Sequence, residues 1–151
     1  MKDQNLFFKQ IDGIPDKKSL EELLTLYTSV FNDAITEFFL ERIQTKEKVF
    51  SIIAYYNNNP VGFKIGYQYN TNTFYSWVGG VLPQYRKKGI ASNLAKLQEN
   101  WALQNGFKKL RTKSMNKFKP MLILNLKNGL DIIQVYTNEK GQTKIVFEKE
   151  I

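Results

Sequence analysis

The chain has 151 residues, and its 22 lysine and arginine side chains outnumber its 14 aspartate and glutamate side chains, so its formal net charge is +8. It contains neither histidine nor cysteine, which excludes disulfides, thiolate nucleophiles, thiolate or imidazole metal sites and Ser-His-Asp relays. Because 42% of the residues are apolar and spread along the chain, we expect residues 1–151 to form a single domain.

The first third of the chain predicts one strand and two helices. Residues 5–11 are strand-like and are followed by a turn that contains glycine and proline. Ser19 and Glu22 have the spacing of a capping box, so a helix is expected to begin there. A second helix is expected from about residue 34 to residue 44, with its core-facing positions at Ile35, Phe38, Phe39 and Ile43.

The middle of the chain predicts a meander of three strands. Residues 48–56 and 61–69 are strand-like runs, and the Asn-rich segment 57–60 between them is typical of a hairpin turn. A third strand is expected to begin at residue 74 and to continue towards Gly79 and Gly80. The three strands follow one another closely enough to be neighbours in one antiparallel sheet.

After Pro83 the apolar period changes to that of a helix, which is expected to begin at Ile90 and to end near Gly106. A strand over 107–114 and a short helix over 118–128 follow, and two further strands are expected over 130–136 and 144–147. The resulting order, β-α-α-β-β-β-α-β-α-β-β, is that of an α/β or mixed α+β domain.

The positive charge is concentrated between residues 86 and 119. This segment has ten basic side chains and one acidic one and so carries +9, whereas the rest of the chain has twelve basic and thirteen acidic side chains and carries −1. A local positive field attracts a nucleic acid or a phosphate-bearing small molecule, and a solvated lysine-rich face is the alternative interpretation. The near-neutral remainder is a surface that a cationic amine could approach.

Residues 78–92 contain the most informative pattern. A strand ends in Gly79 and Gly80, a short basic loop follows, and a helix opens at Gly89. Glycine lets backbone approach a ligand, and the first amides of a helix lack internal partners and lie at the positive end of its macrodipole. The arrangement suits a pyrophosphate. The purely structural alternative is that these glycines only ease a bend and a strand–helix turn.

Arg86-Lys87-Lys88-Gly89-Ile90-Ala91 resembles the Q/R-x-x-G-x-G/A signature of the GNAT (Gcn5-related) N-acetyltransferases, and Val81-Leu82-Pro83-Gln84-Tyr85 resembles the V-x-P-x-Y/F run before it. The resemblance covers the element order of nearly the whole chain and is specific over residues 78 to 130. It implies a GNAT-like fold with a mixed, mostly antiparallel sheet of about seven strands and about four helices. The fourth and fifth strands would splay apart, at 78–81 and 107–114.

The resemblance also implies acetyl transfer from acetyl-CoA to a primary amine of a small molecule or peptide, with no metal. By position, backbone groups at residues 79–81 would pair with the pantetheine arm, and amides at residues 87–92 would hold the pyrophosphate. The expected cofactor-binding residues are Gly79, Gly80, Val81, Arg86, Lys87, Lys88, Gly89, Ile90, Ala91, Ser92 and Asn116.

Asn116 and Gly129-Leu130 resemble the second family signature, in which a tyrosine usually stands four residues before a G-F pair. Here that position is Asn125, and the interval from Asn116 to Gly129 is about two residues longer than usual. The family's tyrosine protonates the leaving CoA thiolate. Asn125 cannot do so well, but its amide can donate a hydrogen bond. We therefore predict Asn125 as a residue of the catalytic site, and the sequence does not identify the general acid.

The general base is also open. Some relatives place a glutamate on the strand before the signature, where this chain offers Tyr75. Glu37 and Glu41 are four residues apart on the second predicted helix, which lines the acceptor groove in the family, and Glu37 is the candidate. The alternative interpretations are solvated carboxylates for this pair and aromatic core packing for Tyr75.

Two other functions compete with the transferase. An acyl-CoA-binding protein without turnover is favoured by Asn125 and the missing strand carboxylate, and a nucleic-acid binder would use the +9 segment. The second lacks interleaved aromatic residues and a recognition helix, so no nucleic-acid partner is expected. The polar start, Met1 to Asn5, and the short apolar runs predict a cytoplasmic protein with no membrane partner. A homodimer paired through the C-terminal strands is a hypothesis from fold analogy.

Overall fold

The computed structural model describes residues 5–151, so Met1 to Gln4 of the polar start lie outside the described range. Its helices are α1 (Lys17–Val30), α2 (Thr36–Thr45), α3 (Ile90–Gln104) and α4 (Lys119–Lys127), with a 3-10 turn, η2 (Pro83–Tyr85). Its strands are β1 (Leu6–Asp12), β2 (Phe50–Tyr56), β3 (Asn59–Gln68), β4 (Thr73–Val81), β5 (Lys109–Met115), β6 (Asp131–Thr137) and β7 (Thr143–Glu150). Over this range, no helix is long and apolar enough to span a bilayer.

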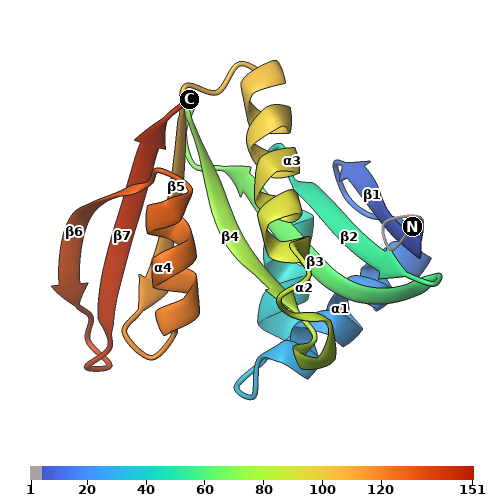
Figure 1. Cartoon of the computed structure of the whole chain (residues 1–151). Helices are drawn as coiled ribbons and strands as arrows, with labels where there is room; N and C mark the ends of the chain where they lie inside the picture. Colours follow the sequence, from blue (N-terminus) through green and yellow to red (C-terminus); the bar gives the residue numbers. More distant parts are fainter. Residues whose placement is uncertain (1–4) are drawn as a thin grey trace.

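The strands form one sheet in the order β1-β2-β3-β4-β5-β7-β6. Every neighbouring pair is antiparallel except β4 and β5, which are parallel. The expected meander is present as β2, β3 and β4. The predicted fold class, a mixed and mostly antiparallel sheet of seven strands with four helices in the described part of the chain, is confirmed (Figure 1).

The parallel pair separates along its length. Thr73 pairs with Lys109 and Ser76 with Thr112, and the pairing stops there although β4 continues to Val81 and β5 to Met115. In Figure 1, β4 and β5 diverge downwards, and their open angle lies between α4 and α3. The predicted splay is therefore confirmed, and it begins directly after Ser76.

Helices cover both faces of the sheet. On one face, α1 and α2 pack through Leu23, Phe39 and Ile43 against Phe63 and Ile65 of β3. On the other, α3 packs through residues such as Ile90, Leu94 and Ala102 against Phe50, Ile52 and Phe74. A smaller cluster of Leu130, Ile145 and Phe147, with Leu122 of α4, lies over β7. The core thus consists of separate layers, and the splay lies between the α3 layer and the α4 layer.

The predicted capping box is wrong. Helix α1 begins at Lys17, and the N-cap is Asp16, whose Oδ1 accepts a hydrogen bond of 2.8 Å from the Ser19 amide. Ser19 lies inside the first turn, and its Oγ accepts from Lys9 Nζ at 2.8 Å. Glu22 accepts a 2.5 Å hydrogen bond from the Tyr55 hydroxyl instead of reaching back to the helix end. Aspartate caps a helix as well as serine does, and Asp16 comes first in the chain.

The predicted core face of the second helix is only partly correct. Phe39 and Ile43 are fully buried, but Ile35 is 60% exposed and Phe38 is 44% exposed. Ile35 is the N-cap residue of α2, outside the helix, so it does not share the helical face. Phe38 packs edge-on against Trp77, with ring centroids 6.4 Å apart, at the border of a cavity.

Candidate active site

The end of β4 offers backbone groups to the splay. The Leu82 amide donates to the Val61 carbonyl oxygen at 2.8 Å, and Phe63 is the cross-strand partner of Gly80. Because hydrogen-bonded and non-hydrogen-bonded pairs alternate in an antiparallel ladder, Gly80 faces β3 and Gly79 and Val81 face the open edge. The side chain of Arg86 returns to this edge, where its Nε donates to the Val81 carbonyl oxygen at 3.0 Å.

Close packing also accounts for both glycines. A Cβ atom at Gly79 would lie 3.0 Å from the Phe63 carbonyl oxygen and 3.2 Å from the Lys64 Cγ. A Cβ atom at Gly80 would lie only 2.7 Å from the Val30 Cγ1 of α1. Both glycines therefore have a structural role, because a side chain at either position would clash with its neighbours. Gly79 also lies on the open edge, where its backbone is accessible to a ligand.

The loop before α3 has the geometry of an anion site. Lys87 and Gly89 have positive φ angles, 64° and 80°, and Gly89 is the N-cap residue. The first bond of the helix joins the Asn93 amide to the Gly89 carbonyl oxygen at 3.0 Å. The amides of residues 90–92 therefore lack intrahelical acceptors and lie at the positive end of the helix. The exposed side chains of Arg86, Lys87 and Lys88 stand beside them.

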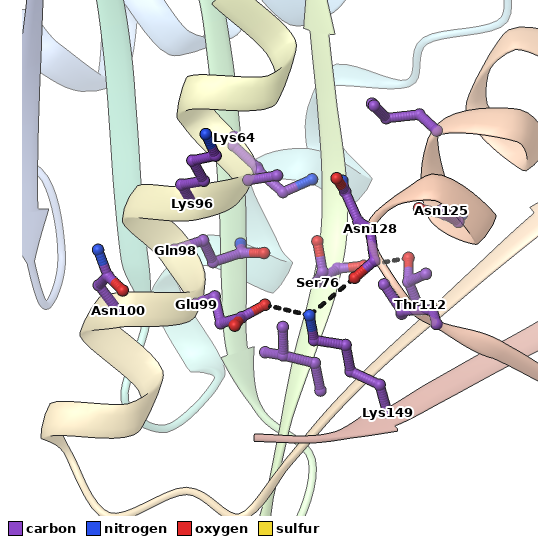
Figure 2. A pocket seen from close by; sticks show the side chains of 14 residues that line it. Lys64, Ser76, Lys96, Gln98, Glu99, Asn100, Thr112, Asn125, Asn128 and Lys149 are labelled. Atoms are coloured by element: carbon purple, nitrogen blue, oxygen red, sulfur yellow. Dashed lines mark hydrogen bonds and ion pairs between the residues drawn. The ribbon is translucent and has the colours of Figure 1, made fainter.

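Two cavities lie on opposite sides of the splay. The first, here the α3 cavity, has a volume of about 340 Å³ and lies between α3, α4 and the sheet. The second, here the α2 cavity, has a volume of about 400 Å³ and is bordered by α2, α4 and strands β4 to β7. Four residues line both: Lys64, Ser76, Thr112 and Asn125. The cavities meet where Thr112 Oγ1 donates to the Ser76 carbonyl oxygen at 2.7 Å, at the last paired position of β4 and β5 (Figure 2).

Lys64 is a site residue that the sequence reasoning missed. It lies on β3 opposite Gly79, is half-buried, and forms no salt bridge within residues 5–151. Burial lowers the pKa of its ammonium group to about 8. The sequence held one signal for it, because Lys64 is the one charged residue in an otherwise apolar and aromatic strand segment from Val61 to Tyr67.

Polar groups also surround the α3 cavity. Gln98 of α3 is 1% exposed, and its Nε2 lacks a hydrogen-bond acceptor in the described chain. Lys149 Nζ lies 2.6 Å from Glu99 Oε1 and donates to the Asn128 carbonyl oxygen at 2.7 Å. Figure 2 shows this bridge, which ties α3, the end of α4 and β7 together beside the cavity.

The structure brings together two of the three expected catalytic residues. Asn125 is 8% exposed and lines both cavities, and Tyr75 lines the α2 cavity. Burial raises the pKa of Tyr75 to about 12, so its phenol is protonated at neutral pH and can donate a hydrogen bond but cannot act first as a base. Glu37 is exposed on α2, outside the lining of either cavity.

Asn116 lies away from both cavities as well. It is exposed in the turn between β5 and α4, where its carbonyl oxygen accepts a hydrogen bond from Lys119 Nζ. The loop of residues 86–89 is likewise exposed and lines neither cavity. The part of the chain with assigned positions has no cluster of three potential metal-ligating side chains.

Besides Lys64 of β3, cations border the α2 cavity from three further elements. Arg42 of α2 lies over the Phe38 ring, 4.5 Å from its centroid, and donates to the Tyr67 hydroxyl at 2.8 Å. Lys113 of β5 and Lys144 of β7 line the same cavity. No aspartate or glutamate of residues 5–151 lines it. The α2 cavity is therefore positive, and Arg42 and Lys144 extend the positive charge beyond the segment of residues 86–119.

Comparisons with known proteins agree with this geometry. The model of the acetyltransferase (GNAT) family matches residues 18–119. No match was found among curated proteins. A GNAT family acetyltransferase from Elizabethkingia anophelis with acetyl-CoA bound has a TM-score of 0.75 and 18% identity, over 97% of this chain and 99% of that chain.

Two further solved structures have the same fold. Naa50 from Arabidopsis thaliana, in complex with the bisubstrate analogue CoA-Ac-MVNAL, has a TM-score of 0.76 and 22% identity, over 97% of this chain and 99% of that chain. Ard1 from Thermoplasma volcanium has a TM-score of 0.80 and 12% identity, over 97% and 98%. With its splayed parallel pair, its glycine-led α3 and the family match over residues 18–119, the chain belongs to the GNAT family of acetyltransferases.

Proposed function

We propose that the protein is an N-acetyltransferase that transfers the acetyl group of acetyl-CoA to a primary amine by direct attack in a ternary complex. The observation that carries this proposal is that two cavities meet at the splay. Acetyl-CoA could bind in one cavity and the amine in the other, so that the amine nitrogen reaches the thioester carbon from the opposite face of the sheet. The acetyl-CoA bound to the similar fold from Elizabethkingia anophelis supports the choice of donor.

The residues at the splay and at α3 suit acetyl-CoA. The free amides of residues 90–92, beside Lys87 and Lys88, would bind the pyrophosphate. The open-edge backbone of Gly79 and Val81 would pair with the amides of the pantetheine arm. The unpaired Nε2 of Gln98 faces the α3 cavity, where it can donate to a carbonyl oxygen of the same arm.

The chemistry needs a stabilised oxyanion and a proton for the leaving group. The amine nitrogen attacks the thioester carbon, the carbonyl oxygen gains negative charge, and the C–S bond then breaks to release the thiolate. The Gly79 amide faces the open edge opposite Lys64, and Gly79 lines the α2 cavity, so this amide would stabilise the oxyanion. Lys64, the one ammonium that lines both cavities in the described chain, would give its proton to the sulfur, and Asn125 would donate a hydrogen bond to it.

An ammonium acceptor must lose one proton before attack, and the α2 cavity supplies no carboxylate base from residues 5–151. The attacking nitrogen loses a second proton when the C–S bond breaks, and this proton restores the Lys64 ammonium. Neighbouring cations disfavour a charged ammonium and so favour the neutral, nucleophilic form of the amine. Arg42, Lys113 and Lys144 would have this effect, with the proton passing to solvent. Tyr75, whose phenol stays protonated, would orient the bound amine through its hydroxyl.

A second candidate is an acyl-CoA-binding protein without turnover, which the buried Asn125 in place of the family's tyrosine favours. Thiol release from acetyl-CoA, measured with a panel of amines, separates the two. We expect release with at least one amine, and faster release at pH 8 than at pH 6. Tight binding of acetyl-CoA by calorimetry, without release on any amine, would support the second candidate. Absence of both would contradict both functions.

A further inference from the structure

The α2 cavity gathers positive charge from elements that are distant in the sequence. Arg42 reaches it from α2, and its guanidinium lies 5.6 Å from the Trp77 ring centroid. Lys144 of β7 is the cross-strand partner of both Met115 of β5 and Tyr136 of β6. Lys113, two residues before Met115 and therefore on the same face of the sheet, donates to the Tyr136 hydroxyl at 3.2 Å. With Lys64 of β3, which also lines it, four cations thus face one cavity.

No carboxylate of the described residues neutralises this charge. The two ion pairs found there join Arg111 to Glu148 and Lys149 to Glu99, and neither pair lines the α2 cavity. Like charges around one cavity repel one another, and their field concentrates ligands of the opposite sign. An anionic group on the acceptor would neutralise this charge, whereas additional ammonium groups on the acceptor would be repelled by it.

The rest of the cavity wall is largely aromatic and apolar. Phe31 and Phe118 meet edge-on with centroids 6.3 Å apart, and Phe38 meets Trp77 in the same way. These residues and Met121 line the cavity together with the cations. The wall therefore fits a ligand with an apolar body and an anionic end.

We infer that the acceptor is a small primary amine that also carries an anionic group, a carboxylate or a phosphate. Arg42, Lys113 and Lys144 bind the anionic group, and the amine points towards Lys64 and Asn125, where the two cavities meet. This inference rests on the proposed N-acetyltransferase function. It excludes polyamines as good acceptors, because their additional ammonium groups would face the cations that line the α2 cavity.

Matched amines test the inference. L-Phenylalanine and 2-phenylethylamine differ by one carboxylate, O-phosphoethanolamine and ethanolamine differ by one phosphate, and spermidine represents polyamines. With acetyl-CoA and the full chain, we expect kcat/KM to be about tenfold or more higher for the anionic member of at least one pair, since hydrogen bonds to charged groups contribute about 1.5–3 kcal/mol. The pair that discriminates identifies the carboxylate or the phosphate as the recognised group.

Charge-neutralising variants provide the second readout. The double variant K113Q/K144Q should lower kcat/KM for the preferred anionic amine about tenfold more than for its neutral partner, mainly through KM. K109Q/K140Q is the matched control, because Lys109 of β5 and Lys140 of the β6–β7 turn are exposed and outside both cavities. The control should retain the preference for the anionic amine.

The outcomes separate this inference from the proposed function. If neither pair favours its anionic member, or if spermidine or a neutral peptide is acetylated at least as fast as both anionic amines, the inference is overturned and the transferase is left intact. Thermal shift of the CoA-loaded protein gives an answer without turnover, because a ligand of the native state raises its melting temperature. If only the anionic member of a pair raises it, and K113Q/K144Q abolishes the shift, recognition of the anionic group at the α2 cavity is supported independently of turnover.

Discussion

Lys64 on β3 lies opposite Gly79 on β4, so closely that a Cβ atom at position 79 would stand 3.2 Å from the lysine Cγ. The missing side chain leaves room for the lysine stem to run across β4 towards the splay. The same glycine keeps the open edge of β4 accessible to a ligand. The absence of a side chain at Gly79 therefore makes room for Lys64, the proposed proton donor, and also for acetyl-CoA, the proposed co-substrate.

Replacing Lys64 should impair the chemical step. A general acid contributes about a hundredfold or more to a rate, so K64M should lower kcat by about that factor with little change in acetyl-CoA affinity. K64R keeps the charge but not a transferable proton, because arginine is not deprotonated in proteins. It should therefore be as slow as K64M. The measurement is thiol release from pH 6 to pH 9.5 with saturating acetyl-CoA.

The pH profile distinguishes a proton donor from a fixed charge. In the unmodified protein, kcat should fall above about pH 8, where the Lys64 ammonium loses its proton. K140M, which removes an exposed lysine of the β6–β7 turn, should keep this profile. Full activity of K64R, with an unaltered fall at high pH, would show that Lys64 is not the donor.

Lys64 should also make folding stability depend on pH. Its pKa is about 8 in the folded protein and 10.5 as an ordinary lysine, so the unfolded chain binds more protons between these values. The free energy of unfolding should rise as pH increases from about 8 to 10, and the penalty of the buried charge should be fully present below pH 8. The window ends near pH 10, because the raised pKa of Tyr75 acts in the opposite sense above it.

Urea unfolding at pH 7, 8.5 and 9.5 measures this dependence. K64M, which has no charge to bury, should be more stable than the unmodified protein at pH 7 by between about 1 and 3 kcal/mol and should show a flatter pH profile. A gain in stability together with a loss of activity is the pattern expected of a functional group held in an unfavourable environment. A less stable K64M would indicate that the lysine ammonium is well solvated.

The order of elements could be predicted because the sequence has strong periodicity and clear turn residues. Glycine or proline stands near most of the element ends, and the strand and helix periods alternate clearly between residues 48 and 128. The start of α1 could not be fixed, since Asp16 and Ser19 are both good caps and the choice depends on tertiary contacts of Ser19 and Glu22.

The part of the site that consists of backbone groups could be predicted from the sequence. The part formed by side chains from different strands could not. Local sequence indicates the open amides after Gly89, because a helix start and a glycine are properties of adjacent residues. The encounter of Lys64, Ser76, Thr112 and Asn125 depends on four separate elements and their register. The cationic α2 cavity is hidden for the same reason, since residues 42, 113 and 144 are close only in the folded chain.

The left-handed residue at the start of α3 should matter for acetyl-CoA binding. Gly89 has a φ angle of 80°, and a Cβ atom there would meet no other atom, so G89A costs only backbone strain of about 1–2 kcal/mol. Relief of that strain would tilt the amides of residues 90–92. We expect acetyl-CoA affinity, measured by calorimetry, to fall about tenfold in G89A and less in G89N, since asparagine tolerates this conformation better.

Gly106 provides the matched control for Gly89. It follows the other end of α3, has a φ angle of 87°, and also has open space around a Cβ atom. G106A should lose as much stability in urea unfolding as G89A while its affinity for acetyl-CoA stays unchanged. Equal losses of affinity in both variants would show that general destabilisation, rather than the geometry of the anion site, weakens binding.

The contact between Gly80 and Val30 should be detectable as a coupling energy. A Cβ atom at position 80 would lie 2.7 Å from the Val30 Cγ1, so G80A should push β4 and the end of α1 apart and destabilise the protein by about 1–3 kcal/mol. V30A removes the obstructing methyl groups, and G80A should therefore cost less in the V30A background. A double-mutant cycle by urea unfolding measures the difference, which we expect to be at least about 0.5 kcal/mol. Equal costs of G80A in both backgrounds would mean that flexibility of the strand, rather than the space beside α1, determines the need for glycine at this position.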